Sequence, residues 1–207
     1  MARTGKQEPS MDGTVRQRLL IGAADLFTRK GYAATTVREI VASAGVTKPV
    51  LYYYFKNKEG IYLELMRQAF AKLDALRDAS LADQGSAKEK LLSFCDQTYS
   101  LFLENIKAVR VMYSIYYGPP QGAPFFDFDA YHLKFHDTVR RLVEEGIRQG
   151  EFRKGNLEDM TWAIIGAINV AMEVHLSHPE MSIGREGIAR VLKLILTGVA
   201  AKKRRRK

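Results

Sequence analysis

The chain has 207 residues, of which 46% are hydrophobic, and carries a formal net charge of +9; this length fits one or two domains with an ordinary core. It has no run of about 18 uncharged apolar residues and no apolar stretch at its N-terminus, so no membrane partner is predicted and a cytoplasmic protein is expected. A single cysteine, Cys95, excludes an internal disulfide and a multi-cysteine metal site, and it is expected to be buried.

The positive charge is concentrated at the two ends of the chain. Residues 1–60 hold ten Lys and Arg against five Asp and Glu, residues 61–201 hold sixteen against eighteen, and residues 202–207 are six consecutive cations. Neutralisation of DNA phosphates requires such an excess of cations, which the middle of the chain lacks. Residues 1–11 and 202–207 are expected to be flexible tails. The basic C-terminal tail is either a solvated extension or an auxiliary nonspecific DNA contact.

A first helix is predicted from Thr14 to Gly31. Thr14 and Gln17 have the spacing of a capping box, and the apolar residues that follow keep a 3.6-residue period. Gly31 ends the pattern, as glycine often does at the end of a helix. This helix is interpreted as the support for the two that follow.

Two short helices separated by a tight turn at Gly45 come next. Thr36 and Glu39 form a second capping box, and Gly45 can adopt the left-handed conformation that ends a helix. Thr47 is a suitable N-cap for the second short helix, with Pro49 in its first turn, where a missing N–H removes no intrahelical bond. The pattern predicts a helix-turn-helix, whose second helix enters the major groove of duplex DNA.

Here the sequence resembles the TetR family of bacterial transcriptional regulators. The matching segments are AADLFTRKGY at residues 23–32, TTVREI at 35–40, AGVTKPVLYYYF at 44–55 and KNKEGIYLEL at 56–65. The resemblance implies an all-α fold of about nine helices. It also implies a three-helix DNA-binding domain over residues 12–60 and a helical regulatory and dimerisation domain over residues 61–201.

Two departures from the family pattern leave the base preference open. Pro49 and Val50 stand where small or hydroxyl residues are often found, and Gly60 stands where an acidic residue is common. The alternative interpretation of this segment is a plain three-helix bundle whose tyrosines are core and whose lysines form a solvated face.

The predicted DNA contacts divide into base-reading and phosphate-holding residues. Lys48 is the first candidate for a base edge, because its ammonium can donate to guanine O6 and N7, and Arg38 is the second. Pro49 and Val50 offer apolar surface to a thymine methyl group. The residues expected to hold phosphates through hydroxyl or ammonium groups are Thr36, Thr47, Tyr52, Tyr53 and Lys58.

The rest of the chain is predicted to be helical. The expected helices cover residues 58–79, 86–105, 109–117, 126–148, 156–175 and 185–201. The last two carry apolar stripes that suit a two-fold four-helix bundle between two subunits, and the family resemblance implies the same homodimer. The predicted dimer interface consists of Ala163, Ala167, Val170, Ala171, Val174, Ile188, Val191, Leu192, Ile195 and Val199. The alternative is that both stripes pack inside one subunit.

Many aromatic residues lie in the middle helices. The resemblance implies that these helices enclose a pocket, where a small molecule changes the spacing of the two DNA-binding heads. The predicted pocket residues are Phe102, Tyr113, Tyr117, Phe128, Tyr131, His132, Phe135 and Trp162, which suggest a lipophilic or aromatic ligand. The alternative is that these aromatic residues are ordinary core.

No catalytic or metal site is predicted. His132 and His136 have a spacing that can bind a divalent ion, but no third ligand is evident. The chain lacks a nucleophile elbow, a zinc-protease helix and a phosphate-binding loop, so no cofactor and no enzyme activity are expected. The leading hypothesis is a homodimeric repressor released from a palindromic double-stranded DNA operator by a small-molecule effector. The rival is a nucleoid-organising DNA-binding dimer without an effector.

Overall fold

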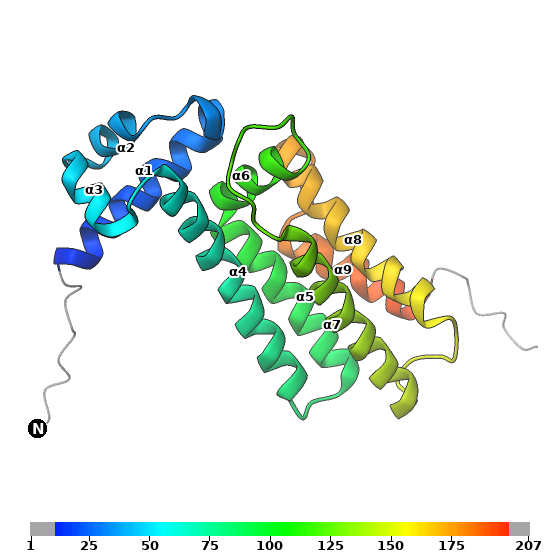
Figure 1. The fold of residues 1–207 in the computed structure, drawn as a ribbon. Coiled ribbons are helices and arrows are strands. Elements are labelled where there is room, and N and C mark those ends of the chain that lie inside the picture. The colour runs from blue at the N-terminus through cyan, green and yellow to red at the C-terminus, as the bar shows by residue number, and fades with distance from the viewer. Residues whose placement is uncertain (1–10, 199–207) are drawn as a thin grey trace, which may run out of the picture. The chain divides into compact units, whose positions relative to one another are not determined.

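The computed structural model describes residues 11–198, which form nine α-helices and one short 3-10 helix, without a strand in that range (Figure 1). The helices are α1 (Met11–Ala34), α2 (Val37–Ala44), α3 (Lys48–Phe55), α4 (Lys58–Ala82), α5 (Ala87–Glu104), α6 (Ile106–Tyr116), α7 (Phe128–Gln149), α8 (Leu157–Ser177), η1 (Pro179–Met181) and α9 (Gly184–Thr197). The all-α prediction is confirmed. The predicted helix starts agree with the structure to within a few residues, and those of α2, α4, α5, α7 and α8 rest on capping side chains. The first helix is an exception, because α1 begins at Met11 and not at the predicted cap Thr14. The predicted tails lie outside the described residues, apart from Met11 at the start of α1.

The helices form two compact units that do not follow a single break in the sequence. The first unit joins the described residues up to Phe70 with Asn105–Phe126, and the second joins Ala71–Glu104 with the residues from Asp127 onward. The sequence pattern places a boundary at residue 60. The structure instead lets α4 contribute to both units and places α6 with the helix-turn-helix, since α6 packs against α1.

The first unit is built around α1, beside which α2 and α3 lie as short helices (Figure 1). Its largest fully buried side chains are Leu19, Leu20, Phe27, Ile40, Leu51, Ile61, Tyr62 and Met66. The helices α1 and α2 approach closely at Gly22, where an added Cβ would lie 2.3 Å from Ser43 Oγ and would require the Ser43 side chain to turn away. A core of this kind fixes the orientation of α2 and α3, and therefore of the side chains on their outer faces.

A loop residue after α6 holds the end of α1. The α1 backbone leaves the helical path at Gly31, at φ 81° and ψ 164°, as the sequence predicted. The Tyr32 N–H donates to Gln121 Oε1 at 2.9 Å, and Gln121 Nε2 donates to Ser114 O at 3.1 Å and Ser114 Oγ at 2.7 Å. Lys107 at the start of α6 also pairs with Asp25 of α1. These contacts explain why α6 belongs to the first unit.

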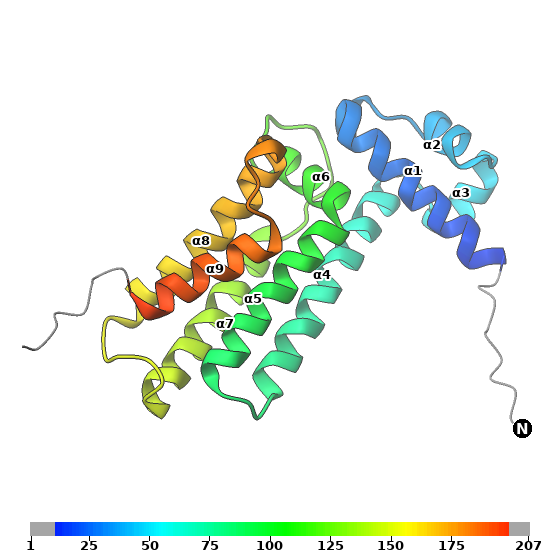
Figure 2. The same ribbon diagram turned by 180° about the vertical axis from the view of Figure 1, so that it is seen from behind.

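The second unit packs α5, α7, α8 and α9 against one another (Figure 2). A buried ion pair joins α5 to α7, in which Lys90 Nζ donates to Glu145 Oε1 and Oε2 at 2.9 and 2.8 Å, and also to Asp83 O at 3.2 Å. Cys95 is fully buried, and this burial raises the pKa of its thiol to about 12. A thiol in that environment is inert, which agrees with the predicted packing role.

Candidate nucleic-acid interface

Both ends of α2 have the cap structures that the sequence predicted. Thr36 Oγ1 accepts from the Glu39 N–H at 3.3 Å, and Glu39 Oε2 accepts from the Thr36 N–H at 2.9 Å. At the other end of α2, Gly45 has φ 64° and ψ 39°, and the Val46 N–H donates to Val41 O at 3.0 Å. This left-handed glycine cap turns the chain sharply into α3.

One face of α3 is anchored and the opposite face is open. Leu51 and Phe55 have 0% and 5% of their surface exposed and pack into the core of the first unit. Tyr52 and Tyr53 on the other side are 47% and 78% exposed, and Lys48 is exposed as well. The core thus fixes α3 while its outer side chains remain available to a large partner.

The polar side chains at the start of α3, and Arg38 in the first turn of α2, have no competing partner within residues 14–198. Thr47 is the N-cap residue, but its side chain makes no capping hydrogen bond. Lys48 and Arg38 are exposed and take part in no ion pair in that range. Uncommitted hydroxyl, ammonium and guanidinium groups are the donors that phosphate oxygens and guanine edges require.

Glu39 places a negative charge beside this surface, and that charge is compensated. The hydrogen bond from Lys30, followed by those from Thr36, lowers the pKa of Glu39 from its ordinary 4.5 to about 2. Because the folded pKa is the lower one, the stabilising effect is complete above pH 4.5 and is lost as the pH falls through about 2. The Thr36 hydroxyl also donates to Glu39 Oε2 at 2.8 Å, so a phosphate contact by Thr36 has to replace that bond.

Lys58 is committed to the fold to a greater degree than the sequence suggested. Its ammonium donates to Tyr32 O at 2.9 Å and lies 4.2 Å from the centroid of the Tyr32 ring. Partial burial lowers the pKa of Lys58 and raises the pKa of Tyr32 to about 12. Lys58 therefore neutralises the carbonyl end of α1, a position where a cation is favoured. Its predicted phosphate contact remains a prediction.

The connection between α3 and α4 is unusually tight. Lys56 has φ 65° and ψ −42°, and the Asn57 N–H donates to Phe55 O at 2.7 Å, which is the hydrogen bond of a γ-turn. Asn57 Oδ1 then accepts from the Gly60 N–H at 2.8 Å and caps α4. A Cβ at Gly60 would lie 1.9 Å from Phe55 O. Gly60, a departure from the family pattern, is therefore required by the close approach of this carbonyl.

Substituting Gly60→Ala is expected to destabilise the first unit by about 2 to 3 kcal/mol, because either the γ-turn or the start of α4 has to move. The only tryptophan, Trp162, lies in the second unit. Hydrogen exchange of α1–α3 amides should therefore accelerate, while the Trp162 fluorescence transition stays in place. The control is Gly155→Ala, whose Cβ would meet only Met160 Sδ at 3.6 Å. Equal exchange rates in the two variants would contradict the close approach.

Comparison with known proteins identifies the family. The family described as bacterial regulatory proteins, tetR family, matches residues 19–65. The HTH-type transcriptional repressor KstR2 of Mycolicibacterium smegmatis is 30% identical over 158 residues, which cover 76% of this chain and 77% of that protein. The chain belongs to the TetR family.

Two further comparisons show how similar this TetR-family chain is to known regulators in structure and in sequence. The TetR-family regulator PfmR from Thermus thermophilus has a similar structure, with a TM-score of 0.72 and 28% identity over 89% of this chain and all of that one. The HTH-type transcriptional activator FasR of Mycolicibacterium smegmatis is 36% identical over 100 residues, covering 44% of this chain and 46% of that protein. This TetR-family protein is a DNA-binding transcriptional regulator.

The predicted pocket residues of this TetR-family regulator are distributed over both units. Tyr113 and Tyr117 belong to the first unit, and the other six belong to the second. Within the second unit, Tyr131 and Phe135 line a hollow, whereas Phe102 and Phe128 are buried. His132 is exposed and Trp162 is 61% exposed, with its ring 5.3 Å from that of His136. Only two of the eight residues therefore line the described hollow.

Three of the residues predicted for the dimer interface of this TetR-family regulator are buried within one subunit. Ala171, Ile188 and Leu192 are 7%, 1% and 2% exposed, and the helices that carry them, α8 and α9, pack against each other and against α5. They have almost no surface left for a second subunit. Of the remaining predicted residues, Val170 is 58% exposed, and Ala163 is exposed as well. Val199 lies outside the described residues.

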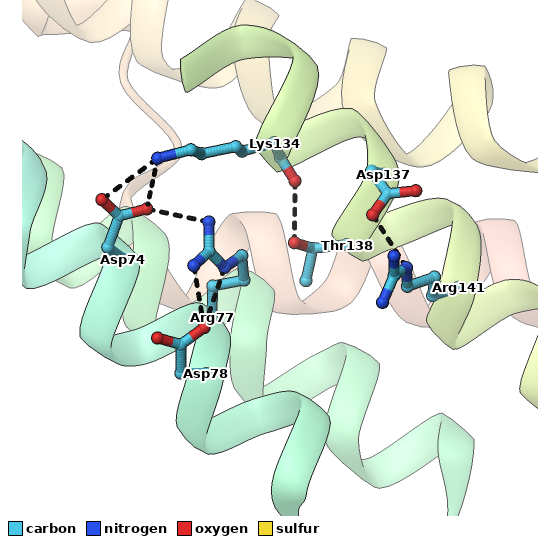
Figure 3. A network of polar contacts seen from close by, with 7 residues as sticks. All are labelled: Asp74, Arg77, Asp78, Lys134, Asp137, Thr138 and Arg141. Carbon is cyan, nitrogen blue, oxygen red and sulfur yellow. Dashed lines mark hydrogen bonds and ion pairs between the residues drawn. The ribbon is translucent and has the colours of Figure 1, made fainter. Parts of the chain in front are cut away.

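Sequence reasoning missed residues whose roles depend on distant partners. Gln121 holds the end of α1 without any local signal in the sequence. Asp74 and Arg77 have the local i,i+3 spacing of an ion pair, but the pairing of Lys134 with Asp74 beside the hollow joins α7 to α4 and could not be predicted (Figure 3). Within residues 11–198, α8 is the one helix whose length and composition would allow it to cross a membrane, with a mean hydropathy of 1.2. Such a helix is weak evidence for a membrane span, since core helices of soluble proteins share these features.

Proposed function

We propose that this regulator is a homodimeric, sequence-specific repressor that leaves a palindromic operator when a small lipophilic or aromatic ligand binds. The open outer face of α3 carries the proposal. Lys48 and Thr47 present unpaired donors there, on a helix whose opposite face is fixed by Leu51 and Phe55. Lys48 and Arg38 contact base edges, and Thr47, Tyr52 and Tyr53 hold the phosphates.

A second subunit is needed because one recognition helix contacts few base pairs. Two copies related by a two-fold axis read two half-sites about one helical turn, or a multiple of it, apart. The outer face of α8 suits this association. Trp162 and Val170 are 61% and 58% exposed, and a Cβ at Gly166 would meet nothing within 4 Å. A second copy of α8 on this face would also account for the apolar character of that helix.

Substituting Val170→Asp is expected to raise the dimer dissociation constant by about 100-fold or more, because two carboxylates would be buried across the two-fold interface. Sedimentation velocity at micromolar protein should then show monomers. The control is Ile21→Asp, at a 49% exposed apolar position of α1, which should leave the dimer intact. A Val170→Asp variant that stays dimeric would assign the interface to another surface.

Selection of bound duplexes from a random pool tests the proposal directly. The regulator should return an inverted repeat, and footprinting should show both half-sites protected. Recovery of no common sequence, with equal affinity for random duplexes, would favour the nucleoid-organising alternative. Deleting residues 202–207 separates the two further, because a regulator keeps its operator preference whereas a protein that depends on its basic tail loses most of its binding.

A further inference from the structure

The side chain of Arg16 on α1 contacts both the end of the recognition helix α3 and the start of α4. Its guanidinium carbon lies 5.4 Å from the centroid of the Phe55 ring, a distance at which a cation and an aromatic ring attract each other. The same guanidinium pairs with Glu64 of α4, with Nη2 donating to Oε1. Phe55 is the last residue of α3 and is almost completely buried. Arg16 therefore connects three helices of the first unit.

Three side chains donate to the Glu64 carboxylate. Its Oε1 accepts from Gln68 Nε2 at 2.9 Å as well as from Arg16, and its Oε2 accepts from Arg67 Nη1 at 2.5 Å. Arg67 and Gln68 follow Glu64 on α4 by three and four residues, so they hold its side chain against its own helix. The Glu64 side chain is 20% exposed and that of Arg16 is 36% exposed, so solvent screens their pairing only in part. The carboxylate is thus fixed in the place where Arg16 meets it.

The end of α3 depends on such contacts for its direction. The helix has eight residues, and α2 is the helix on which it packs most closely. A helix of this length has little stability of its own, so tertiary contacts decide how it is oriented. After Phe55 the chain passes through the γ-turn at Lys56 directly into α4 (Figure 1). Arg16 acts at this junction, at the opposite end of α3 from Lys48.

We infer that Arg16 and Glu64 are positioning residues for the DNA contacts of α3. The inference rests on the proposed function, since it concerns the same recognition helix. A specific contact between Lys48 and a base edge requires that α3 is held to within about 0.5 Å. Arg16 holds it by stacking on Phe55 while it pairs with Glu64. The pair therefore contributes to operator preference without a contact to DNA.

The pairing with Glu64 distinguishes this role from a phosphate contact by Arg16. If Arg16 held a phosphate, Glu64 would compete with that phosphate for the guanidinium, and its negative charge would repel DNA. Removing the charge of Glu64 would then raise the affinity for any duplex. A positioning role predicts the opposite sign for the operator, because Arg16 loses the partner that holds it over Phe55.

Arg16→Met and the isosteric Glu64→Gln test the inference. For the inverted repeat that the wild type selects, we expect the affinity to fall about tenfold in Arg16→Met and about threefold in Glu64→Gln, because a charge-assisted contact is lost or weakened. The affinity for a random duplex should change by less than about twofold, and its salt dependence should stay the same, whereas the loss of one phosphate contact lowers that slope by about 1. The double variant should bind no more weakly than Arg16→Met, since both changes remove the same interaction.

Arg18→Met and Glu59→Gln are the matched controls. Arg18 is an exposed cation of α1, and Glu59 is an exposed carboxylate in the first turn of α4. Neither takes part in an ion pair within residues 14–198. They alter the charge of the first unit by the same amounts as the two test variants, so they should shift the affinities for both duplexes alike and leave the operator preference unchanged.

Hydrogen exchange of the free protein tests the positioning without DNA. The amides of Lys56 and Asn57 donate to Tyr52 O and Phe55 O at the end of α3. They should exchange faster in Arg16→Met and Glu64→Gln than in Arg18→Met, because the junction opens more often.

The outcomes separate this inference from the proposed function. A wild type that selects no common sequence would contradict the repressor, while faster exchange of these amides would still support the role of Arg16. Higher operator affinity of Glu64→Gln, equal losses on operator and random duplex, or unchanged exchange in both variants would each overturn the inference.

Discussion

Lys48→Ala is expected to weaken operator binding by about 1 to 3 kcal/mol and to relax the sequence preference, because an ammonium that donates to a guanine edge is lost. The residue is exposed and has no ion pair within residues 14–198, so its loss should leave the fold unchanged. Affinities for the operator and for a random duplex of equal length, measured at several salt concentrations, give both quantities. The preference for the operator should fall together with its affinity.

Two control variants distinguish a base contact by Lys48 from a phosphate contact and from a general effect of net charge. Thr47→Val removes only a hydroxyl that makes no capping bond, so operator and random duplex should lose affinity alike. Arg148→Ala removes an exposed cation from α7, outside the helix-turn-helix, and should change neither affinity measurably. If Lys48→Ala behaved like Thr47→Val, with equal losses on both duplexes, Lys48 would be a phosphate contact and the base reading would pass to Arg38.

Lys90→Ala is expected to cost the second unit about 3 kcal/mol of stability, because it leaves Glu145 partly buried without its cation. The Lys90 side chain is 4% exposed and that of Glu145 is 20% exposed, so solvent compensates only in part. The midpoint of thermal unfolding, followed by Trp162 fluorescence, should fall by about 6 °C or more.

The neighbouring lysine is the matched control for this pair. Lys88 is exposed on the same helix, its ammonium takes part in no ion pair within residues 14–198, and its backbone N–H donates to Glu151 Oε2 at 2.9 Å. Lys88→Ala should therefore change stability by less than about 0.5 kcal/mol. Recovery of most of the lost stability in the double variant Lys90→Met with Glu145→Leu would confirm that the unpaired charge is the cause. Equal midpoints for Lys90→Ala and Lys88→Ala would mean that the buried pair contributes nothing.

The helices could be predicted from the sequence because their causes are local. The capping box of Thr36 and Glu39 and the left-handed cap at Gly45 depend on neighbours within a few residues. The exposed and buried faces of α3 follow from its period, which placed Leu51 and Phe55 inward. Local chemistry therefore specified most of the helix-turn-helix and the side chains on its outer surface.

The partners of each helix could not be predicted, because periodicity shows that a face is apolar but not what covers it. The stripe of Ile188 and Leu192 packs inside its own subunit, although the same pattern suits a dimer. The sequence suggested that Lys58 is a free cation, whereas in the structure its ammonium donates to the backbone oxygen of Tyr32. Long-range contacts of this kind decide the boundary of the first unit as well as the residues around the hollow.

The packing of α6 on α1 determines which residues have to be included when the DNA-binding unit is fused to another protein. A fragment cut after residue 60 would strip Ala108 and Val111 from the flank of α1 and leave Tyr32 without the amide acceptor of Gln121. Such a fragment should aggregate or unfold. A chimaera that joins this DNA-binding unit to another ligand-binding domain should therefore include both stretches of the unit, Met1–Phe70 and Asn105–Phe126.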